Sequence, residues 1–187
     1  GRLSKVKNLK LLIDAFGILR ERLKDTNLVI VGDGEEKEDL VNYVESLGLD
    51  KEILFTGPLA NPYSLMAKSM LITLTSISEA LPTVIIEAFA LGKTVVSTPT
   101  CGAIDLLSGG EYGYLTKRFD NPIEFAELME KAVALPIDQK KLVDRANFFC
   151  CREPINRVDS LIKSFIIFKL LCFLTVCLKI EYGNYGA

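Results

Sequence analysis

The sequence predicts a doubly wound α/β domain, in which helices cover both faces of a parallel sheet, over residues 1–150. Short apolar runs alternate with amphipathic stretches along this part of the chain. The runs are continuously apolar, which is typical of strands buried on both faces of a parallel sheet. Strands that alternate with helices form βαβ units with right-handed crossovers.

Five apolar runs are the strand candidates, and most of them end at residues that favour turns. They lie at 28–31, 53–55, 70–74, 94–97 and 112–115. A doubly wound sheet binds its ligand at the carboxyl ends of the strands. We therefore expect four loops to gather at that edge, namely 1–8, 32–34, 57–61 and 76–83. One further strand is expected to lead into Gly1.

The spacing of apolar residues predicts the helices between these runs. Apolar side chains recur at three and four residues over 9–23 and 40–47, with Gly48 as a stop signal. The segment from Thr83 to Leu91 is apolar nearly all round, which predicts a buried helix with Pro82 as its first residue. Two more helices are predicted, one from Asn121-Pro122 and one over 138–149.

The amino-acid composition excludes several kinds of catalytic and metal site. The chain has 187 residues, no histidine and a formal net charge of −2. Without histidine it forms no Ser-His-Asp triad, no Cys-His dyad and no His-ligated zinc site. The near-neutral charge argues against duplex nucleic acid as a partner. Five cysteines without a C-x-x-C pair favour buried thiols in a reducing cytoplasm over a disulfide framework or a metal site.

Residues 151–187 depart from the alternating pattern and form a separate apolar tail. A membrane span needs about 20 apolar residues, but Lys169 stands near the middle of the apolar stretch 161–180. Three interpretations stay open: a C-terminal helix packed on the domain, a helix at the inner face of the membrane, and a non-native end of the reading frame. The start at Gly1-Arg2-Leu3 resembles the inside of a turn, so we expect a fragment of a longer protein.

Two carboxylates, Glu79 and Glu87, stand eight residues apart around Pro82. Glu79 is predicted in the loop before the helix, and Glu87 inside the helix in an apolar setting. A buried carboxylate needs hydrogen-bond donors, and a sugar or ribose diol supplies two. The backbone amides of Leu81, Pro82, Thr83 and Val84 would surround a helix N-terminus suited to a phosphate, although proline itself lacks the N–H. The plain alternative is that both glutamates are solvated surface residues.

Two further loops carry candidate residues. Arg2 and Lys7 lie in a loop before a helix, where two cations can clamp a diphosphate. Such a basic loop is more often only solvated. Gly32 and Gly34 close the first apolar run, but they are too few for a dinucleotide fingerprint. Their role in a tight turn is a sufficient explanation, with ligand contact as the alternative.

Taken in order, these motifs resemble one protein family. The loop G-R-L-x-x-x-K-N, the strand L-V-I-V-G-D-G, the turn I-L-F-T-G-P, the block E-A-L-P-T-V-I-I-E-A-F-A-L-G-K-T and the later G-E-Y-G-Y-L follow one another over residues 1–150. This arrangement is similar to the C-terminal, donor-binding half of group 1 (family 4) retaining glycosyltransferases of the GT-B fold. The E-x7-E block is the most specific of these motifs.

The resemblance implies a role for each matching residue. Arg2 and Lys7 match the cations that bind the diphosphate of the donor and offset charge on the leaving group. Glu79 matches the catalytic glutamate that faces the donor sugar, and Glu87 the one that holds the ribose. The amides of 81–84 match those that face the distal phosphate. Phe55, Thr56 and Gly57 match the wall against which the base packs.

The resemblance also implies partners. The donor is a UDP- or GDP-type nucleotide sugar, no divalent metal or other cofactor is needed, and a glycan or lipid-linked acceptor binds to an N-terminal domain that is absent here. Ala80 stands where the family commonly has glycine, and 100–105 replaces a glycine-rich stretch. A cell-surface polysaccharide pathway in the cytoplasm, with contact to the inner membrane face as an option, is the expected setting.

Two other functions remain as alternatives. One is a non-catalytic nucleotide-sugar-binding or regulatory module. The other is an α/β domain of the flavodoxin or receiver type, which would leave Glu87 inside an apolar helix without a purpose.

Overall fold

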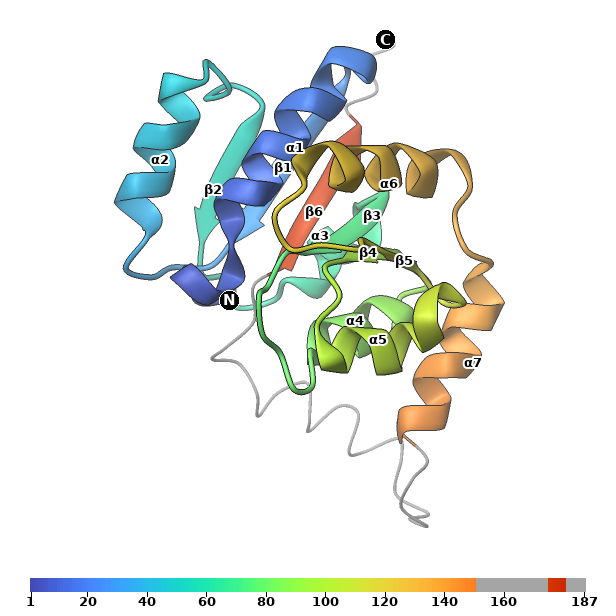
Figure 1. The fold of residues 1–187 in the computed structure, drawn as a ribbon. Helices are drawn as coiled ribbons and strands as arrows, with labels where there is room; N and C mark the ends of the chain where they lie inside the picture. Colours follow the sequence, from blue (N-terminus) through green and yellow to red (C-terminus); the bar gives the residue numbers. More distant parts are fainter. Residues whose placement is uncertain (151–174, 181–187) are drawn as a thin grey trace, which may run out of the picture.

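The computed structural model describes residues 1–150 and 175–180, the latter as backbone only. Five of the strands follow the predicted runs. They are β1 (Thr26–Val31), β2 (Ile53–Gly57), β3 (Leu71–Leu74), β4 (Thr94–Ser97) and β5 (Tyr114–Leu115). The sixth, β6 (Thr175–Ile180), lies in the middle of the sheet, whose order is β2-β1-β6-β3-β4-β5 (Figure 1).

The five predicted strands run parallel, which confirms the doubly wound fold class. Leu28 of β1 pairs with Ile53 of β2, and Leu71 of β3 with Thr94 of β4. β6 differs, because it pairs antiparallel with both β1 and β3. A helical tail is therefore wrong for Thr175–Ile180, where the sequence is rich in strand-forming residues. The other tail residues, 151–174 and 181–187, lie outside the described residues.

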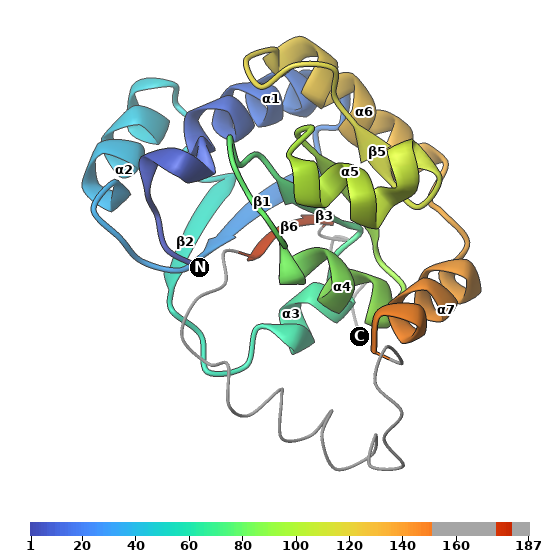
Figure 2. The same ribbon diagram turned by 60° about the horizontal axis from the view of Figure 1, so that its bottom comes forward.

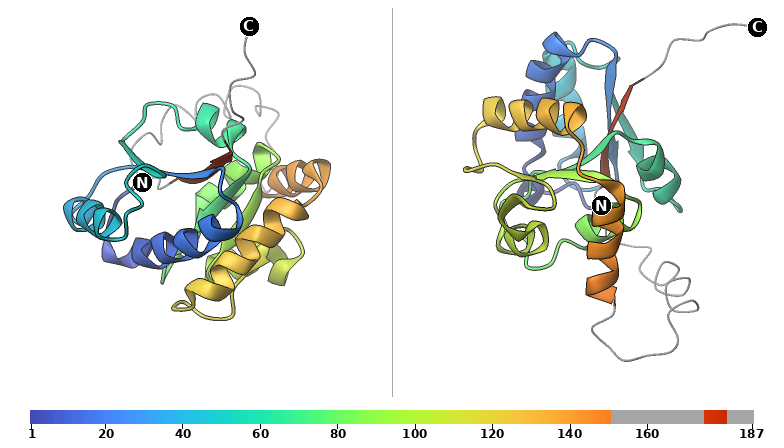
Figure 3. Two further views of the ribbon diagram at one scale, coloured as in Figure 1. Left: turned by 90° about the horizontal axis from the view of Figure 1, so that it is seen from above. Right: turned by 90° about the vertical axis from the view of Figure 1, so that its right-hand side faces the viewer.

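Helices cover both faces of the sheet. One face carries α1 (Leu9–Arg22), α2 (Lys37–Ser46) and α6 (Pro122–Ala134). The other carries α3 (Tyr63–Lys68), α4 (Thr83–Ala90), α5 (Cys101–Leu107) and α7 (Gln139–Cys150). Figure 3 shows α1 and α6 on one side and α3 on the other. Two 3-10 turns, Lys5–Lys7 and Ser108–Gly110, complete the described elements.

Alternate residues of β1 supply the two cores, as the period of a strand requires. Leu28 and Ile30 of β1 pack with α1, α2 and α6, whereas Val29 and Val31 pack with the helices of the opposite face. Both sets are buried. This burial on two faces explains why the strand runs are continuously apolar.

Side-chain caps fix where several helices begin. The Asn121 side chain accepts a hydrogen bond from the Glu124 amide at 3.2 Å and starts α6. Thr100 accepts one from the Ala103 amide and starts α5. Pro82 precedes α4 with a non-helical ψ of 89°, so the prediction that it is the first helical residue is wrong by one position.

The loops at the carboxyl ends of the strands gather as expected. The Gly1 amine donates to the Val31 carbonyl at 2.7 Å, and the Gly32 amide donates to the Gly57 carbonyl at 2.9 Å. The Ile77 amide donates to the Val6 carbonyl at 2.8 Å. The N-terminus consequently lies beside the tips of β1 and β2 (Figures 1 and 2). Among the described helices, none has both the length and the apolarity that crossing a bilayer requires.

Candidate functional site: a cation–carboxylate pair at the strand ends

The basic loop is anchored on the segment that follows β3. The Thr75 hydroxyl donates to the Lys7 carbonyl at 2.8 Å, next to the Ile77–Val6 backbone bond. Asn8 ends the loop in the left-handed region, with φ of 49°, and its side chain donates to the Phe119 carbonyl. These contacts hold Lys7 in place although its partners are far away in the sequence.

The Lys7 ammonium forms an ion pair with the Glu79 carboxylate. Both side chains are largely hidden, with exposed fractions of 17% and 20%. The Ser76 hydroxyl donates to the same oxygen, Oε1 of Glu79, at 3.0 Å. The structure therefore brings together one predicted cation and one predicted carboxylate, and adds a serine that the sequence motifs did not single out.

The start of α5 packs against the loop that contains Glu79 and holds its backbone. The Gly102 amide donates to the Glu79 carbonyl at 3.1 Å. A Cβ atom at Gly102 would lie 2.4 Å from the Ala80 carbonyl oxygen and 2.5 Å from Cδ of Pro82, so the close approach requires glycine. The stretch 100–105, whose sequence differs from the expected glycine-rich one, forms the start of α5. It thus supports the acidic loop, residues 79–82.

Arg2 takes a different partner from Lys7. Its Nε lies 3.2 Å from Oε2 of Glu35, and its side chain is 73% exposed. A backbone hydrogen bond within Glu35 lowers the pKa of that carboxyl, and the Arg2 guanidinium lowers it further. The two predicted diphosphate clamps therefore have separate carboxylate partners, and Arg2 is open to solvent.

Glu87 lies on α4, and its Oε2 atom is buried. Tyr63 at the start of α3 is electrostatically coupled to it: burial raises the pKa of Tyr63, and the Glu87 charge raises it further. Tyr63 is a second residue that the motifs missed.

Gly32 and Gly34 have a structural role in the close approach of two backbones. Gly32 has a φ of +138°, and a Cβ there would lie 1.7 Å from the Gly1 carbonyl oxygen. A Cβ at Gly34 would lie 2.3 Å from the carbonyl oxygen of Leu3. The two glycines thus let the basic loop rest on the turn after β1, whatever part they take in ligand contact.

The other predicted binding residues lie around the start of α4 and at the end of β2. Leu81 is 59% exposed and Val84 is buried. Oγ1 of Thr83, the first residue of α4, is buried and has no hydrogen-bond partner among the described residues. On β2, Phe55 packs against the core on the α1 face, and Thr56 donates to the Gly57 carbonyl at 2.9 Å.

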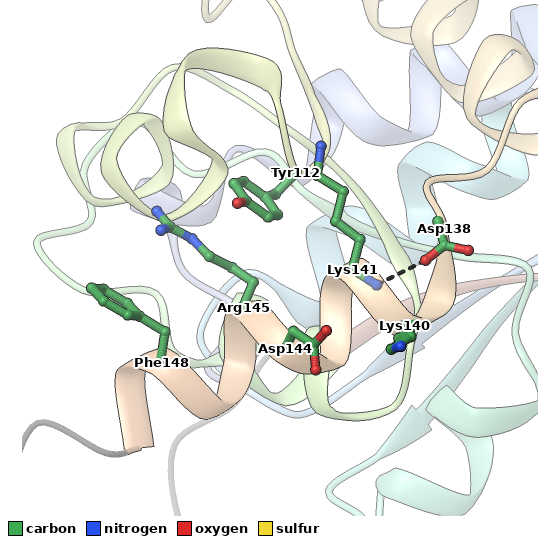
Figure 4. Close-up of a pocket in the computed structure, with 7 residues that line it drawn as sticks. All are labelled: Tyr112, Asp138, Lys140, Lys141, Asp144, Arg145 and Phe148. Atoms are coloured by element: carbon green, nitrogen blue, oxygen red, sulfur yellow. Dashed lines mark hydrogen bonds between the residues drawn. The ribbon is translucent and has the colours of Figure 1, made fainter.

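A separate pocket of about 470 Å³ lies on α7 and beside Tyr112 (Figure 4). Two of its three cations hold α7 to the domain. Arg145 donates to the carbonyls of Asp105 and Leu106 and stacks 4.6 Å from the Tyr112 ring centre. Lys141 pairs with Glu111 at 3.2 Å. None of the residues predicted for ligand binding lines this pocket.

Among the described residues, no group of three or more His, Cys, Asp or Glu side chains could hold a metal ion. The candidate groups are the Lys7–Glu79–Ser76 cluster at the strand ends, and the Thr83 hydroxyl and the buried Glu87 oxygen on α4. Such a set offers one cation, two carboxylates and two hydroxyls to a ligand.

The sequence and the fold are similar to known glycosyltransferases. The chain is 30% identical over 157 residues to an uncharacterized glycosyltransferase of Methanocaldococcus jannaschii. The matched region covers 76% of this chain and 38% of the relative. It is 38% identical over 118 residues to the N-acetylgalactosamine-N,N'-diacetylbacillosaminyl-diphospho-undecaprenol 4-alpha-N-acetylgalactosaminyltransferase of Campylobacter jejuni, covering 63% of this chain and 32% of the relative. The chain thus spans about a third of these relatives.

Solved structures agree. HepE of Anabaena in complex with UDP has a TM-score of 0.69 at 26% identity, over 88% of this chain and 47% of HepE. TarM has a TM-score of 0.73 at 21% identity, over 90% of this chain and 34% of TarM, which shows the fold. A family model described as glycosyl transferases group 1 matches residues 1–147. The chain therefore belongs to the group 1 glycosyl transferases.

Proposed function

We propose that this chain is the nucleotide-sugar half of a retaining glycosyltransferase that acts on a glycan or lipid-linked acceptor. Family membership supports this proposal, as does the UDP in the HepE complex. The name of the Campylobacter relative specifies a diphospho-undecaprenol-linked substrate for that protein. The observation that carries the proposal is the Lys7–Glu79 ion pair at the carboxyl ends of the strands.

The pair gives a simple sequence of events on donor binding. A diphosphate carries more charge than one carboxylate, so it competes with Glu79 for the Lys7 ammonium. Once Lys7 faces the diphosphate, it offsets the charge that develops on the leaving group. Glu79 is then free to accept hydrogen bonds from hydroxyl groups of the donor sugar, with Ser76 keeping its carboxylate in orientation.

The start of α4 completes the proposed donor site. The Thr83 hydroxyl, which has no partner among the described residues, would donate to a phosphate oxygen near the helix N-terminus. Glu87 would accept the two ribose hydroxyls, and Tyr63 would border the same subsite. Arg2, open to solvent, would supply a second cation to the diphosphate.

We further propose that the donor binds without a divalent metal, because Lys7, Arg2 and the α4 terminus provide the positive charge. The acceptor would bind to a second domain, as the share of the relatives that this chain spans suggests. Transfer needs closure of both domains over the donor. The chain by itself should then bind a nucleotide sugar without transferring the sugar.

Calorimetric titration of the 187-residue chain with UDP, GDP and their sugars, in EDTA, tests the proposal. We expect one nucleotide to bind, and Glu87→Gln to weaken it by at least about tenfold, as the loss of a charge-assisted hydrogen bond does. Lys7→Met should weaken the diphosphate more than the matching nucleoside monophosphate. Glu45→Gln and Lys51→Met, at exposed positions, are the matched controls. No binding, or equal binding by variants and controls, would contradict the donor site.

A further inference from the structure

Two adjacent residues after β3 each hold one member of the cation–carboxylate pair. The Thr75 hydroxyl donates to the Lys7 carbonyl at 2.8 Å, and the Ser76 hydroxyl donates to Oε1 of Glu79 at 3.0 Å. Both hydroxyl-bearing residues are almost completely buried. The position of this short segment therefore determines where the Lys7 backbone and the Glu79 carboxylate lie.

The neighbouring strand β4 holds the same segment through Thr98, the residue that follows it (Figure 1). The Thr98 amide donates to the Leu74 carbonyl at 2.9 Å, which extends the pairing of β3 and β4 by one bond. The Thr98 hydroxyl donates to the Ser76 carbonyl at 2.6 Å, with the Leu74 carbonyl further away at 3.4 Å. A side chain of one strand thus takes over the pairing where the main-chain ladder of the other ends.

A purely structural role for this hydroxyl is the alternative, because a buried carbonyl such as that of Ser76 needs a donor. Thr116, the residue after β5, shows what such a role looks like: its hydroxyl donates to the Arg118 carbonyl at 2.7 Å, and it too is buried. The difference lies in the acceptor residue. Ser76 itself donates to Glu79, so the bond from Thr98 belongs to a chain of hydrogen bonds that ends at a residue of the candidate site.

We propose that Thr98 is a positioning residue for the donor sugar: its hydroxyl fixes the backbone of Ser76 and, through the Ser76 side chain, the orientation of the Glu79 carboxylate. For the sugar, this inference rests on the proposed function. Hydrogen bonds weaken steeply as their geometry worsens, so a displaced carboxylate loses its contacts with sugar hydroxyls. In the proposed site the diphosphate contacts Lys7 and Arg2 instead. Loss of the Thr98 hydroxyl should therefore weaken the nucleotide sugar selectively.

Calorimetric titration of the 187-residue chain with UDP, GDP, UDP-N-acetylglucosamine and GDP-mannose measures this selectivity, as the affinity for the nucleotide sugar divided by that for its nucleoside diphosphate. Thr98→Val keeps the shape and removes the hydroxyl. It should lower the ratio about three- to tenfold and leave the affinity for the diphosphate within about twofold of the wild type. Thr98→Ser should restore the ratio, whereas Thr116→Val, the matched control, should not change it. Thr98→Cys keeps a weaker donor and should give an intermediate ratio, which serves if Thr98→Val does not fold.

A second variant tests whether Thr98 acts through Ser76. Ser76→Ala should lower the same ratio, and Thr98→Val added to it should lower the ratio no further, because the chain of hydrogen bonds is already broken. Equal losses in Thr98→Val and Thr116→Val, or a loss that adds to that of Ser76→Ala, would overturn the positioning role.

Unfolding in urea supplies a measurement that needs no ligand. The coupling energy of Lys7 and Glu79, from the cycle of Lys7→Met and Glu79→Gln, is determined in the wild type and in the Thr98→Val and Thr116→Val backgrounds. General destabilisation cancels within each cycle. We expect the coupling to fall in the Thr98→Val background alone. No binding by the wild-type chain would contradict the proposed function and not the hydrogen-bond chain; a coupling that Thr98→Val leaves unchanged would then overturn the role of Thr98 by itself.

Discussion

Lys7 and Glu79 are 72 residues apart in the chain, yet they form an ion pair at the edge of the sheet. One belongs to the loop that lies beside the end of β1, and the other to the loop that follows β3. The pair joins the two halves of the sheet on the side where a ligand would bind. Its two charges are also the groups that the proposed donor would separate.

The first prediction concerns the stability that this pair provides. Lys7→Met and Glu79→Gln should each lower the free energy of unfolding by about 1–3 kcal/mol, because each leaves a largely hidden charge without its partner. The double variant should lose less than the sum of the two, since it removes both charges together. Urea unfolding of the four proteins measures the coupling.

An exposed pair provides the control for that cycle. Lys37 lies 3.7 Å from Asp33, and both side chains are well exposed. Lys37→Met should cost no more than about 0.5 kcal/mol. The contrary result is that Lys7→Met lowers the free energy of unfolding by no more than Lys37→Met does, and that the Lys7 and Glu79 substitutions are additive. The Lys7–Glu79 pair would then provide no coupling energy, and the proposal that a diphosphate displaces it would lose its basis.

The second prediction concerns Gly102, which supports the acidic loop. Gly102→Ala would place a methyl group against the carbonyl of Ala80 and the ring of Pro82, so the loop must move. We expect Gly102→Ala to lower the free energy of unfolding by about 1–3 kcal/mol, the usual cost of overpacking, and to weaken nucleotide binding.

Gly17→Ala in α1 is the control. Its methyl group would make an ordinary contact 3.5 Å from Leu49, and alanine favours the helix, so this variant should be more stable than the wild type. Thermal unfolding and titration distinguish the two; an unchanged Gly102→Ala protein would contradict the close packing.

The third prediction uses the Tyr43–Asp14 hydrogen bond, in which the phenol donates to Oδ1 of Asp14 at 2.6 Å. This bond, together with partial burial and the charge of Asp14, raises the pKa of Tyr43 above its ordinary value of about 10. The unfolded chain then loses this proton at a lower pH than the folded chain. The stabilisation is fully present below pH 10 and is lost as the pH rises through the folded pKa.

Tyr43→Phe should therefore lower the free energy of unfolding by about 0.5–1.5 kcal/mol at pH 8 and flatten its decline above pH 10. Asp14→Asn keeps an acceptor but removes the charge, so it should also reduce the slope. Denaturant unfolding between pH 8 and 11 checks both variants. A decline in Tyr43→Phe as steep as in the wild type would show that other groups cause it.

Much of the fold could be predicted because apolar periodicity follows burial directly. The β1 run is apolar at every position from Leu28 to Val31 since both faces of the sheet are covered. The short helices α3 and α5 were not predicted, because six and seven residues are too few for a periodic signal. β6 was missed for another reason: its partners are distant in sequence, and only tertiary pairing distinguishes an apolar strand from an apolar helix.

Residues of the candidate site could be predicted where a residue type implies its chemistry. Lys7 and Glu79 were singled out as cation and carboxylate, and the structure brings them together. Their direct contact could not be read from the sequence, because it depends on how the loops cross at the sheet edge. Ser76 was missed since a serine in a loop carries no spacing signal, and Tyr63 since the short helix that it begins has no periodic signal.

The last prediction separates ligand binding from stability at Thr83. Its buried hydroxyl has no hydrogen-bond partner among the described residues, so it costs free energy in the ligand-free protein. Thr83→Val keeps the shape and removes the hydroxyl. The variant should be as stable as the wild type or up to about 1 kcal/mol more stable, while it binds the nucleoside diphosphate several-fold more weakly.

Thr73→Val in β3 is the matched control. The Thr73 hydroxyl is also buried without a partner in the described part of the chain, but it lies inside the sheet. It should change stability in the same direction and leave the affinity alone. Equal effects of the two substitutions on affinity, measured by the same titration, would remove Thr83 from the donor site.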